Sequence, residues 1–285
     1  MSTASTAIRL DRHQIRATFF VLGWVGRRFP GLVREITRQG HEVGCHSYWH
    51  RLIYQQSPEE FREDLRLARD VLESAAGTGV NAYRAPSYSI TRDSLWALDI
   101  LKDEGFRYDS SIFPTYHPRY GIPEAKCYPH RLSNEHGSLW EFPPSVAQFL
   151  GWNIPVTGGG YFRLYPAQWT ASGFRHINRL GHPGVFVIHP WEIDPDQPRL
   201  KEIKIRKADS PEGVSDLGFG IRNLGFRAWR HYLNLESTEK KLDWFLKQLA
   251  FGALGDVAER LANQEIVFSM SPVRPSLRLV TSEVG

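Results

Sequence analysis

Short apolar runs alternate with segments of helical periodicity along the first two thirds of the chain. Ala17–Gly23 is an apolar run that precedes a helical stretch, and Val185–Ile188 is a second, uninterrupted apolar run. Runs of this length between helical segments are typical of strands in a parallel sheet. The pattern predicts an α/β fold, with strands near residues 16–22, 41–45, 81–84, 106–109, 138–142 and 185–189.

Three helices between these strands have recognisable ends. The first begins at Pro30, a residue type that suits the first helical turn, and ends at Gly40. The second begins with Ser-Pro-Glu-Glu at Ser57–Glu60, which is a capping box. Thr91 caps the third helix, which stops near Gly105. The apolar positions that give these helices one buried face are Leu32, Val33, Ile36, Phe61, Leu65, Ala68, Leu72, Leu95, Leu98 and Leu101.

Residues 201–285 carry no recognisable motif, and we expect them to form an extension of a domain that spans residues 1–200. Residues 201–214 are a basic run followed by a polar loop. Thr238–Leu261 has apolar residues at helical spacing and predicts one long amphipathic helix, and Ile266–Met270 reads as a final strand. A stripe of this kind is typical of a core or a partner-facing surface. We therefore expect a mainly helical extension packed on the first domain.

Composition narrows the class of protein. A chain of 285 residues with 41% apolar content can bury one large core, and 23% charged residues argue against disorder. The net charge of +4 leaves an acidic polysaccharide or a membrane surface open as partners, but a solvated basic face explains it, and we expect no nucleic-acid partner.

The sequence also bears on location. No apolar run approaches the roughly 18 residues that a membrane span needs. Met1–Ala7 lacks the basic patch and apolar core of a signal peptide, and two cysteines cannot build a disulfide scaffold. We expect a cytoplasmic protein without a membrane span.

Two histidines four residues apart, His46 and His50, are the most informative pair in the chain. Imidazoles at this spacing can converge on one divalent ion, and the run from His41 to Gly44 reads as a short strand that precedes them. The spacing alone is weak evidence for a metal site, because a chain with eleven histidines would contain such a pair by chance in roughly four shuffled sequences of ten. A polar loop with two surface histidines is the alternative.

Further motifs surround this pair in a fixed order. Ala-Thr-Phe-Phe-Val-Leu-Gly at 17–23 precedes it, and Tyr-Arg-Ala-Pro-Ser-Tyr at 83–88 and Val-Ile-His-Pro-Trp-Glu at 187–192 follow. This order resembles the NodB-type polysaccharide deacetylases (carbohydrate esterase family four). Tyr-Asp-Ser-Ser-Ile-Phe-Pro at 108–114 and Gly-Gly-Gly-Tyr-Phe-Arg at 158–163 resemble the subgroup found with bacterial exopolysaccharide and exosortase loci.

The resemblance covers roughly residues 8–200 and implies a (β/α)7-type barrel. In the family, the first strand carries two aspartates, of which one is the general base and the other the third metal ligand. Here only sixteen residues precede Ala17, and Asp11 is the sole acid among them. The implied fold is therefore an incomplete (β/α)7-type deacetylase barrel that lacks its first strand.

The resemblance assigns roles to residues at the ends of predicted strands. It implies that His46 and His50 hold one divalent metal ion, for which zinc is the expected identity. It implies that His189 donates a proton to the departing amine, a role that suits an unperturbed pKa of about 6.5. A packed, hydrogen-bonded histidine before Pro190 is the alternative.

In the family, the arginine at the position of Arg84 orients the catalytic base, and a guanidinium group suits such a bidentate contact. With the aspartate pair absent, a substitute acid is required. Asp109 is the best internal candidate, although an Asp-Ser-Ser turn is more often a cap. Asp11 and Glu192 are weaker candidates.

Aromatic side chains crowd the motif loops, and sugar rings pack on aromatic faces. Trp191, beside His189, and Tyr88 are the residues we expect to bind substrate, with ordinary core packing as the alternative for each. Cys45 is adjacent to His46, so on a strand its side chain points to the opposite face. We expect Cys45 to be buried and not to be a ligand.

Three functional hypotheses follow. The first is metal-dependent hydrolysis of N-acetyl groups from a bacterial polysaccharide or oligosaccharide, with the first strand missing from this sequence. The second is a catalytically inactive deacetylase-like protein that binds glycan or acts as a scaffold. The third is a split enzyme in which a partner chain supplies the strand and its aspartates. Two histidines alone would hold a metal weakly, because catalytic zinc sites usually have three protein ligands.

Overall fold

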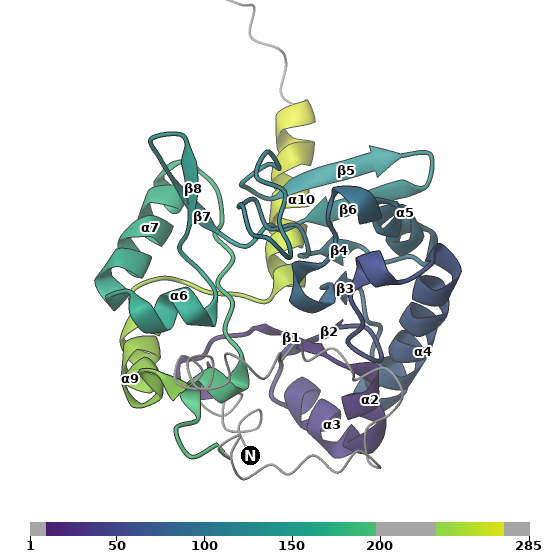
Figure 1. The fold of residues 1–285 in the computed structure, drawn as a ribbon, viewed down its shortest axis with the longest axis horizontal. Helices are drawn as coiled ribbons and strands as arrows, with labels where there is room; N and C mark the ends of the chain where they lie inside the picture. The colour runs from purple at the N-terminus through teal and green to yellow at the C-terminus, as the bar shows by residue number, and fades with distance from the viewer. Residues whose placement is uncertain (1–9, 198–231, 271–285) are drawn as a thin grey trace, which may run out of the picture.

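The computed structural model describes residues 10–197 and 232–270, and within these ranges a six-stranded sheet forms the centre of the molecule (Figure 1). Its strand order is β1-β2-β3-β4-β6-β5, with β5 antiparallel to β6 and the other pairs parallel. The strands are β1 (Thr18–Val21), β2 (Glu42–Cys45), β3 (Ala82–Tyr83), β4 (Tyr108–Asp109), β5 (His130–Asn134) and β6 (Gly137–Glu141). The predicted α/β class with a largely parallel sheet is confirmed.

Four helices connect the first strands and cover one side of the sheet (Figure 1). They are α2 (Gly23–Arg28), α3 (Pro30–Arg38), α4 (Pro58–Ala76) and α5 (Trp96–Asp103). Their apolar faces pack with β2 and β3 in the largest buried cluster, in which Ile36, Phe61, Leu65 and Leu72 are fully buried. The helical stripes that the sequence predicts therefore face this core.

The ends of these helices follow their local sequence. Ser57 accepts a hydrogen bond from the backbone of Glu60, whose side chain accepts one from Ser57, so the predicted capping box is present. Pro30 occupies the first turn of α3, and Gly40 has φ of +79° just after its end. Thr91 forms its box around a single 3-10 turn, η3 (Arg92–Ser94), and α5 follows.

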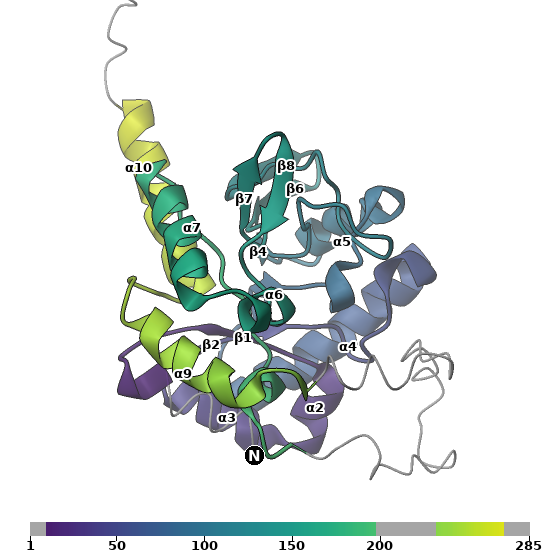
Figure 2. The ribbon, with the colours of Figure 1, turned by 60° about the vertical axis from the view of Figure 1, so that its left-hand side comes forward.

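A second group of elements packs around another buried cluster. It contains the hairpin of β7 (Val146–Phe149) and β8 (Trp152–Pro155), together with α6 (Gly159–Leu164), α7 (Ala167–Arg179) and α9 (Leu235–Leu246). Phe162, Phe174 and Phe245 are buried in this cluster, and Phe19 of β1 packs against it. Helix α9 lies next to α6 and α7 in both views (Figures 1 and 2).

The prediction of a strand at residues 185–189 is wrong. The backbone amides of Val185 and Val187 donate to the hydroxyls of Ser145 and Thr157, at 2.7 Å each. These amides are satisfied by side chains instead of a neighbouring strand, so the apolar run lies outside the sheet ladder. It still delivers His189 to the turn η4 (Pro190–Ile193).

The predicted single helix over Thr238–Leu261 is also wrong. Helix α9 ends at Leu246, Gly252 lies in the break, and α10 (Leu254–Met270) begins anew. The predicted strand at Ile266–Met270 is the last part of α10. The backbone amide of Leu254 donates to the Thr18 hydroxyl, so a side chain from β1 caps the start of this helix. Sequence reasoning also missed β5, β7 and β8 as strands.

Within the described ranges, no helix is long and apolar enough to cross a bilayer. The predicted basic run and polar loop at residues 201–214 lie outside the described residues. The parallel strands bring the loops after β2, β3, β4 and β6 to the same edge of the sheet, because parallel strands end on one side. That edge carries most of the predicted site residues.

Candidate active site

The loop after β2 brings the two predicted metal-binding histidines together. The imidazole rings of His46 and His50 lie 5.2 Å apart between centroids and nearly perpendicular to each other. Nδ1 of His46 donates a hydrogen bond to the carbonyl oxygen of Arg84 at 2.6 Å. Because the acceptor is a carbonyl, this bond fixes the tautomer and leaves Nε2 of His46 as the nitrogen available to a ligand.

A buried acid beneath this loop holds its shape. Asp64 of α4 accepts hydrogen bonds from the backbone amides of Tyr48 and Trp49, at 2.7 and 3.2 Å. Positive φ angles at Ser47 and His50, of 64° and 60°, turn the chain sharply on either side. The spacing of His46 and His50 is thus set by an acid from the following helix, which sequence reasoning did not identify.

Both histidines are in an environment that favours the neutral ring. Burial and, to a smaller extent, the neighbouring His50 lower the pKa of His46 to about 3. Burial also lowers the pKa of His50. The charge of His189 contributes to lowering both pKa values. His189, the predicted proton donor, therefore lies within electrostatic reach of the two predicted metal ligands. Neutral imidazole is the form that binds a metal ion.

These residues fit a divalent ion only in part. A ligating histidine typically donates its other ring nitrogen to a carbonyl or carboxylate, as His46 does to Arg84. Among residues 10–197 and 232–270, however, no cluster of three or more His, Cys, Asp or Glu side chains is placed to hold a metal. The described residues therefore offer two ligands of a site, and zinc binding stays a prediction.

Cys45 is fully buried beside this loop, as predicted. Burial raises the pKa of its thiol to about 12, so it stays protonated and is unsuited to metal ligation or nucleophilic attack.

The guanidinium group of Arg84 lies at the end of β3 and contacts serine, not a carboxylate. Its Nε donates to the carbonyl oxygen of Ser110 at 3.1 Å, and Nη2 donates to the Ser110 hydroxyl at 2.7 Å. The central carbon of the Arg84 guanidinium lies 4.3 Å from the centroid of the Phe20 ring. Burial lowers the Arg84 pKa. Within the part of the chain that the structure describes, Arg84 forms no ion pair, so Asp109, the best internal candidate for a substitute acid, does not contact it directly.

Asp109 instead shares a buried site with Glu141, its register partner on β6. Ser111 donates to Oδ1 of Asp109 at 2.5 Å, and the amide of Ile112 donates to Oε1 of Glu141 at 3.1 Å. Burial raises the pKa of both carboxyls, and burial together with the charge of the neighbouring Asp109 raises the pKa of Glu141 well above its usual range. The raised pKa values favour a protonated form of this pair, and the charges of Asp109 and Glu141 oppose the effect of burial on the Arg84 pKa.

Tyr88 lies close to Arg84 and to a second aromatic residue. Its ring centroid is 5.9 Å from the Arg84 guanidinium and 5.2 Å from the ring of Phe113. Ser87 and Tyr88 both have positive φ, of 52° and 55°, which is uncommon for residues with a side chain. The structure thus places Tyr88 beside Arg84, and substrate binding by Tyr88 stays a prediction.

His189 and Trp191 reach the site from the second group of elements. Their rings lie 5.8 Å apart between centroids and almost parallel, and the His189 side chain is 59% exposed. Glu192, which is buried, accepts hydrogen bonds from the backbone amide and Nδ1 of His189, at 2.9 and 3.2 Å. Glu192 is therefore not the partner of Arg84 that the sequence left open, because its carboxylate lies beside His189.

The residues that sequence reasoning missed are the buried groups behind the motifs. Asp64 lies on the buried face of α4, and Glu141 lies among the buried residues of β6; the other buried residues of both elements are apolar. An acid at such a position was the signal in the sequence that could have identified them. Asp109 and the serines beside it were visible as the Asp-Ser-Ser sequence, but their contacts depend on pairing between β4 and β6.

Comparisons with known proteins agree with the resemblance at the level of the deacetylase domain. Residues 2–108 match the family model "Polysaccharide deacetylase", and residues 110–209 match a "Domain of unknown function (DUF3473)". A peptidoglycan-N-acetylglucosamine deacetylase of Bacillus cereus is 32% identical over 92 residues, which cover 32% of this chain and 34% of that protein. A chitooligosaccharide deacetylase of a Bradyrhizobium species is 29% identical over 92 residues, which cover 32% and 40%. The matched segment thus spans a third to two fifths of these relatives.

The fold has a solved counterpart. The crystal structure of a Mycobacterium smegmatis protein described as a candidate polysaccharide deacetylase aligns with 97% of this chain and 82% of its own, at a TM-score of 0.60 and 20% identity. The arrangement of elements described above is therefore that of a known fold, and the likeness extends past the first domain model into the second.

Proposed function

We propose that this chain forms the barrel of a metal-dependent deacetylase that removes N-acetyl groups from a bacterial polysaccharide. The match of residues 2–108 to polysaccharide deacetylases supports the reaction class. The motifs at 108–114 and 158–163 support a substrate of the exopolysaccharide type. The observation that carries the proposal is the neutral, oriented imidazole of His46, with Nδ1 bonded to Arg84 and the ring of His50 5.2 Å away.

In this proposal, each residue has a physical role. His46 and His50 would hold a divalent ion, and imidazole ligands favour zinc. The bound ion would polarise the acetyl carbonyl and activate a water molecule. His189 gives a proton to the amine nitrogen as the C–N bond breaks, and its exposure leaves it open to substrate. Trp191, which stacks on His189, and Tyr88 offer aromatic faces for sugar rings. Arg84 orients the base, which we place outside the described residues.

A second function is favoured by one specific observation. The structure places no third ligand beside His46 and His50 among the residues it describes, and Arg84 has no carboxylate partner there. A glycan-binding protein that does not turn over substrate fits these facts. A partner chain or a further segment that supplies the acids also fits them.

The test is acetate release from N-acetylated oligosaccharides by the protein isolated from its source cells, with its intact mass measured in the same preparation. We expect zinc-dependent release that falls at least about a hundredfold in His46→Ala and His50→Ala, because each removes a ligand. Cys127→Ser, which lies away from the histidine loop, is the control. We also expect the 285-residue chain by itself to release acetate no faster than its own His46→Ala variant.

Three outcomes separate the hypotheses. Glycan binding without metal binding or acetate release would favour the inactive protein. Release that needs a longer product or a second polypeptide would identify the source of the base. Zinc-dependent turnover that His46→Ala leaves unchanged would refute the assignment of the metal site.

A further inference from the structure

A buried carboxylate lies directly behind the exposed ring of His189. Glu192 is 2% exposed, and its Oε2 accepts hydrogen bonds from both the backbone amide and Nδ1 of His189. The same oxygen therefore fixes the start of the turn and the orientation of the ring. A carboxylate bonded to Nδ1 leaves Nε2 as the nitrogen that can exchange a proton with substrate.

An arginine holds this carboxylate from the other side. Nε of Arg163, on α6, lies 3.6 Å from Oε1 of Glu192, and both side chains are less than a tenth exposed. The Arg163 guanidinium also lies 4.9 Å from the ring of Trp191. His189, Glu192 and Arg163 thus form a chain of contacts from the surface into the second buried cluster, with Trp191 packed along it.

A glycine makes room for the Glu192 carboxylate. A Cβ atom added to Gly159 would overlap all three carboxyl atoms of Glu192. A Cβ atom added to Gly160, the next residue of the same helix, would meet nothing within 4 Å. The position of the Glu192 carboxylate therefore requires glycine at 159 but not at 160. Alanine at position 160 is a matched control for alanine at position 159.

The C-terminal part of the described chain braces this arrangement. Nη1 of Arg163 donates to the carbonyl oxygen of Leu233 at 3.4 Å. Asn234 and Lys241, just before and within α9, donate to the carbonyl oxygen of Arg163 at 3.0 and 2.9 Å. Lys241 also donates to the carbonyl of Tyr165. Arg163 is therefore fixed by a helix that contributes no motif.

We propose that Glu192 is a positioning residue that fixes the ring and tautomer of His189, and that α9 sets its place through Arg163. The inference rests on the proposed function for its consequence in catalysis. When protonated His189 transfers its Nε2 proton to the amine, the neutral ring that remains carries its proton on Nδ1. Glu192 accepts a hydrogen bond from that nitrogen before and after the transfer, so no reorientation is required.

The test is the tautomer of His189, measured by ¹⁵N NMR of histidine-labelled protein at neutral pH and assigned with a His189→Gln variant. Wild type and Gly160→Ala should show the Nδ1–H form. Gly159→Ala, which displaces the carboxylate, should shift the signal towards a mixture of tautomers. The two alanine variants raise helix propensity equally, so thermal unfolding of both separates displacement from misfolding.

A second pair of variants separates geometry from charge. Glu192→Gln keeps an acceptor for Nδ1–H and should retain the tautomer, whereas Glu192→Ala should lose it. In the native enzyme, kcat should fall about tenfold to a hundredfold in Glu192→Ala and Gly159→Ala, with KM little changed. Gly160→Ala should match wild type.

The outcomes distinguish the inference from the proposed function. An unchanged tautomer in both folded Gly159→Ala and Glu192→Ala would overturn the inference, whatever the activity. A changed tautomer in a protein that never releases acetate would refute the proposed function and leave the positioning of His189 by Glu192 standing.

Discussion

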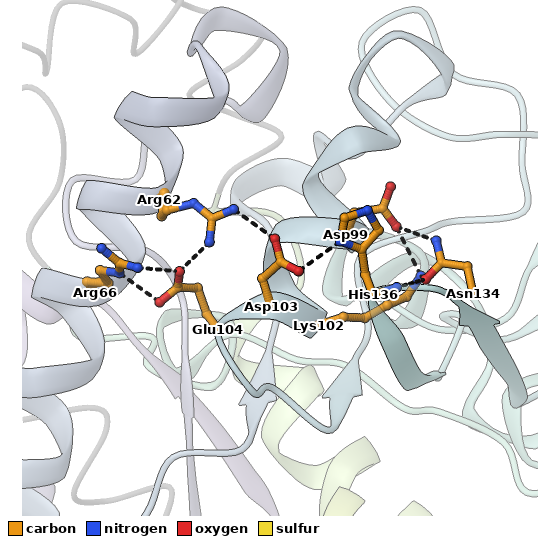
Figure 3. A network of polar contacts seen from close by, with 8 residues as sticks. All are labelled: Arg62, Arg66, Asp99, Lys102, Asp103, Glu104, Asn134 and His136. Atoms are coloured by element: carbon orange, nitrogen blue, oxygen red, sulfur yellow. Dashed lines mark hydrogen bonds and ion pairs between the residues drawn. The ribbon is translucent and has the colours of Figure 1, made fainter.

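The molecule uses charged residues in two contrasting ways. Below the candidate site, Asp64, Asp109, Glu141 and Arg84 lie in the interior and bond mainly to backbone groups and hydroxyls. On the surface, α4, α5 and the β5–β6 hairpin carry a chain of eight polar residues that bond mainly to one another (Figure 3). Both regions hold acids and arginines, but only the first determines where functional side chains lie.

The surface network is continuous, and most of its side chains are about a third exposed or more, whereas Glu104 and Lys102 are 12% and 5% exposed. Arg62 bridges Asp103 and Glu104, at 2.9 and 2.5 Å, and Arg66 forms a bidentate contact with Glu104 (Figure 3). Asp103 continues the chain to His136 at 2.8 Å. Charges in such a setting are screened by water and salt, so their number says little about stability.

The interior acids have the opposite character. Burial removes these acids from water, which raises the pKa values of Asp64, Asp109 and Glu141. Hydrogen bonds from backbone amides and hydroxyls offset part of this cost. Removing one leaves buried partners without a bond. Stability and site geometry therefore depend on a few interior acids, and among these only Asp109 belongs to a sequence motif.

The largest expected effect belongs to Asp64. Asp64→Ala leaves the amides of Tyr48 and Trp49 without their acceptor and should lower the free energy of unfolding by about 3 kcal/mol. Urea denaturation measures this change. Glu63→Ala, on the exposed face of the same helix, should change it by less than about 0.5 kcal/mol. Equal effects of the two substitutions would contradict the proposed support of the histidine loop.

A second, pH-dependent effect belongs to Glu141, and near pH 5 it is smaller than the effect of Asp64→Ala. Its folded pKa is raised, so the stability it contributes is complete below its unfolded value of about 4.5 and is lost as pH rises towards the folded pKa. Glu141→Gln keeps the donor to Asp109 and the acceptor for Ile112 but cannot ionise. The variant should therefore gain on wild type by up to about 1.4 kcal/mol per pH unit above pH 4.5.

Unfolding curves of wild type and Glu141→Gln at several pH values provide the measurement. Parallel pH profiles of the two proteins would show that Asp109 and Glu141 do not share a buried proton.

The smallest effect is expected in the surface network. Glu104→Gln removes the acid that pairs with Arg62 and Arg66, and it should cost less than about 1 kcal/mol. The cost should shrink further in about 1 M salt, which screens exposed charges. A cost as large as that of Asp64→Ala, unchanged by salt, would remove the distinction between the two regions.

Much of the first half of the fold could be predicted from sequence because its signals are local. Each signal depends on residues only a few positions apart, and the structure contains each of them: the capping box at Ser57, the first-turn proline Pro30 and the apolar face of α4. The spacing of His46 and His50 after a short strand also placed the two rings together. Local geometry was sufficient for these features.

Other features were set by residues far apart in the chain. Val185–Ile188 has the composition of a strand, but its amides are taken by the hydroxyls of Ser145 and Thr157. Asp109 was a candidate partner for Arg84, but the register of β4 and β6 places it against Glu141. A hydrogen-bond partner some tens of residues away leaves no periodic trace in the sequence.

The sequence by itself determined the α/β class, the first helices and the chemistry of the motif residues, because periodicity, caps and side-chain types act locally. The tertiary structure alone decided which buried partner each polar group found. Thr18 and Glu42 receive the first amides of α10, and Gly159 leaves the space that Glu192 fills behind His189. Buried polar groups must be paired, and only the packed chain determines which partners are within reach.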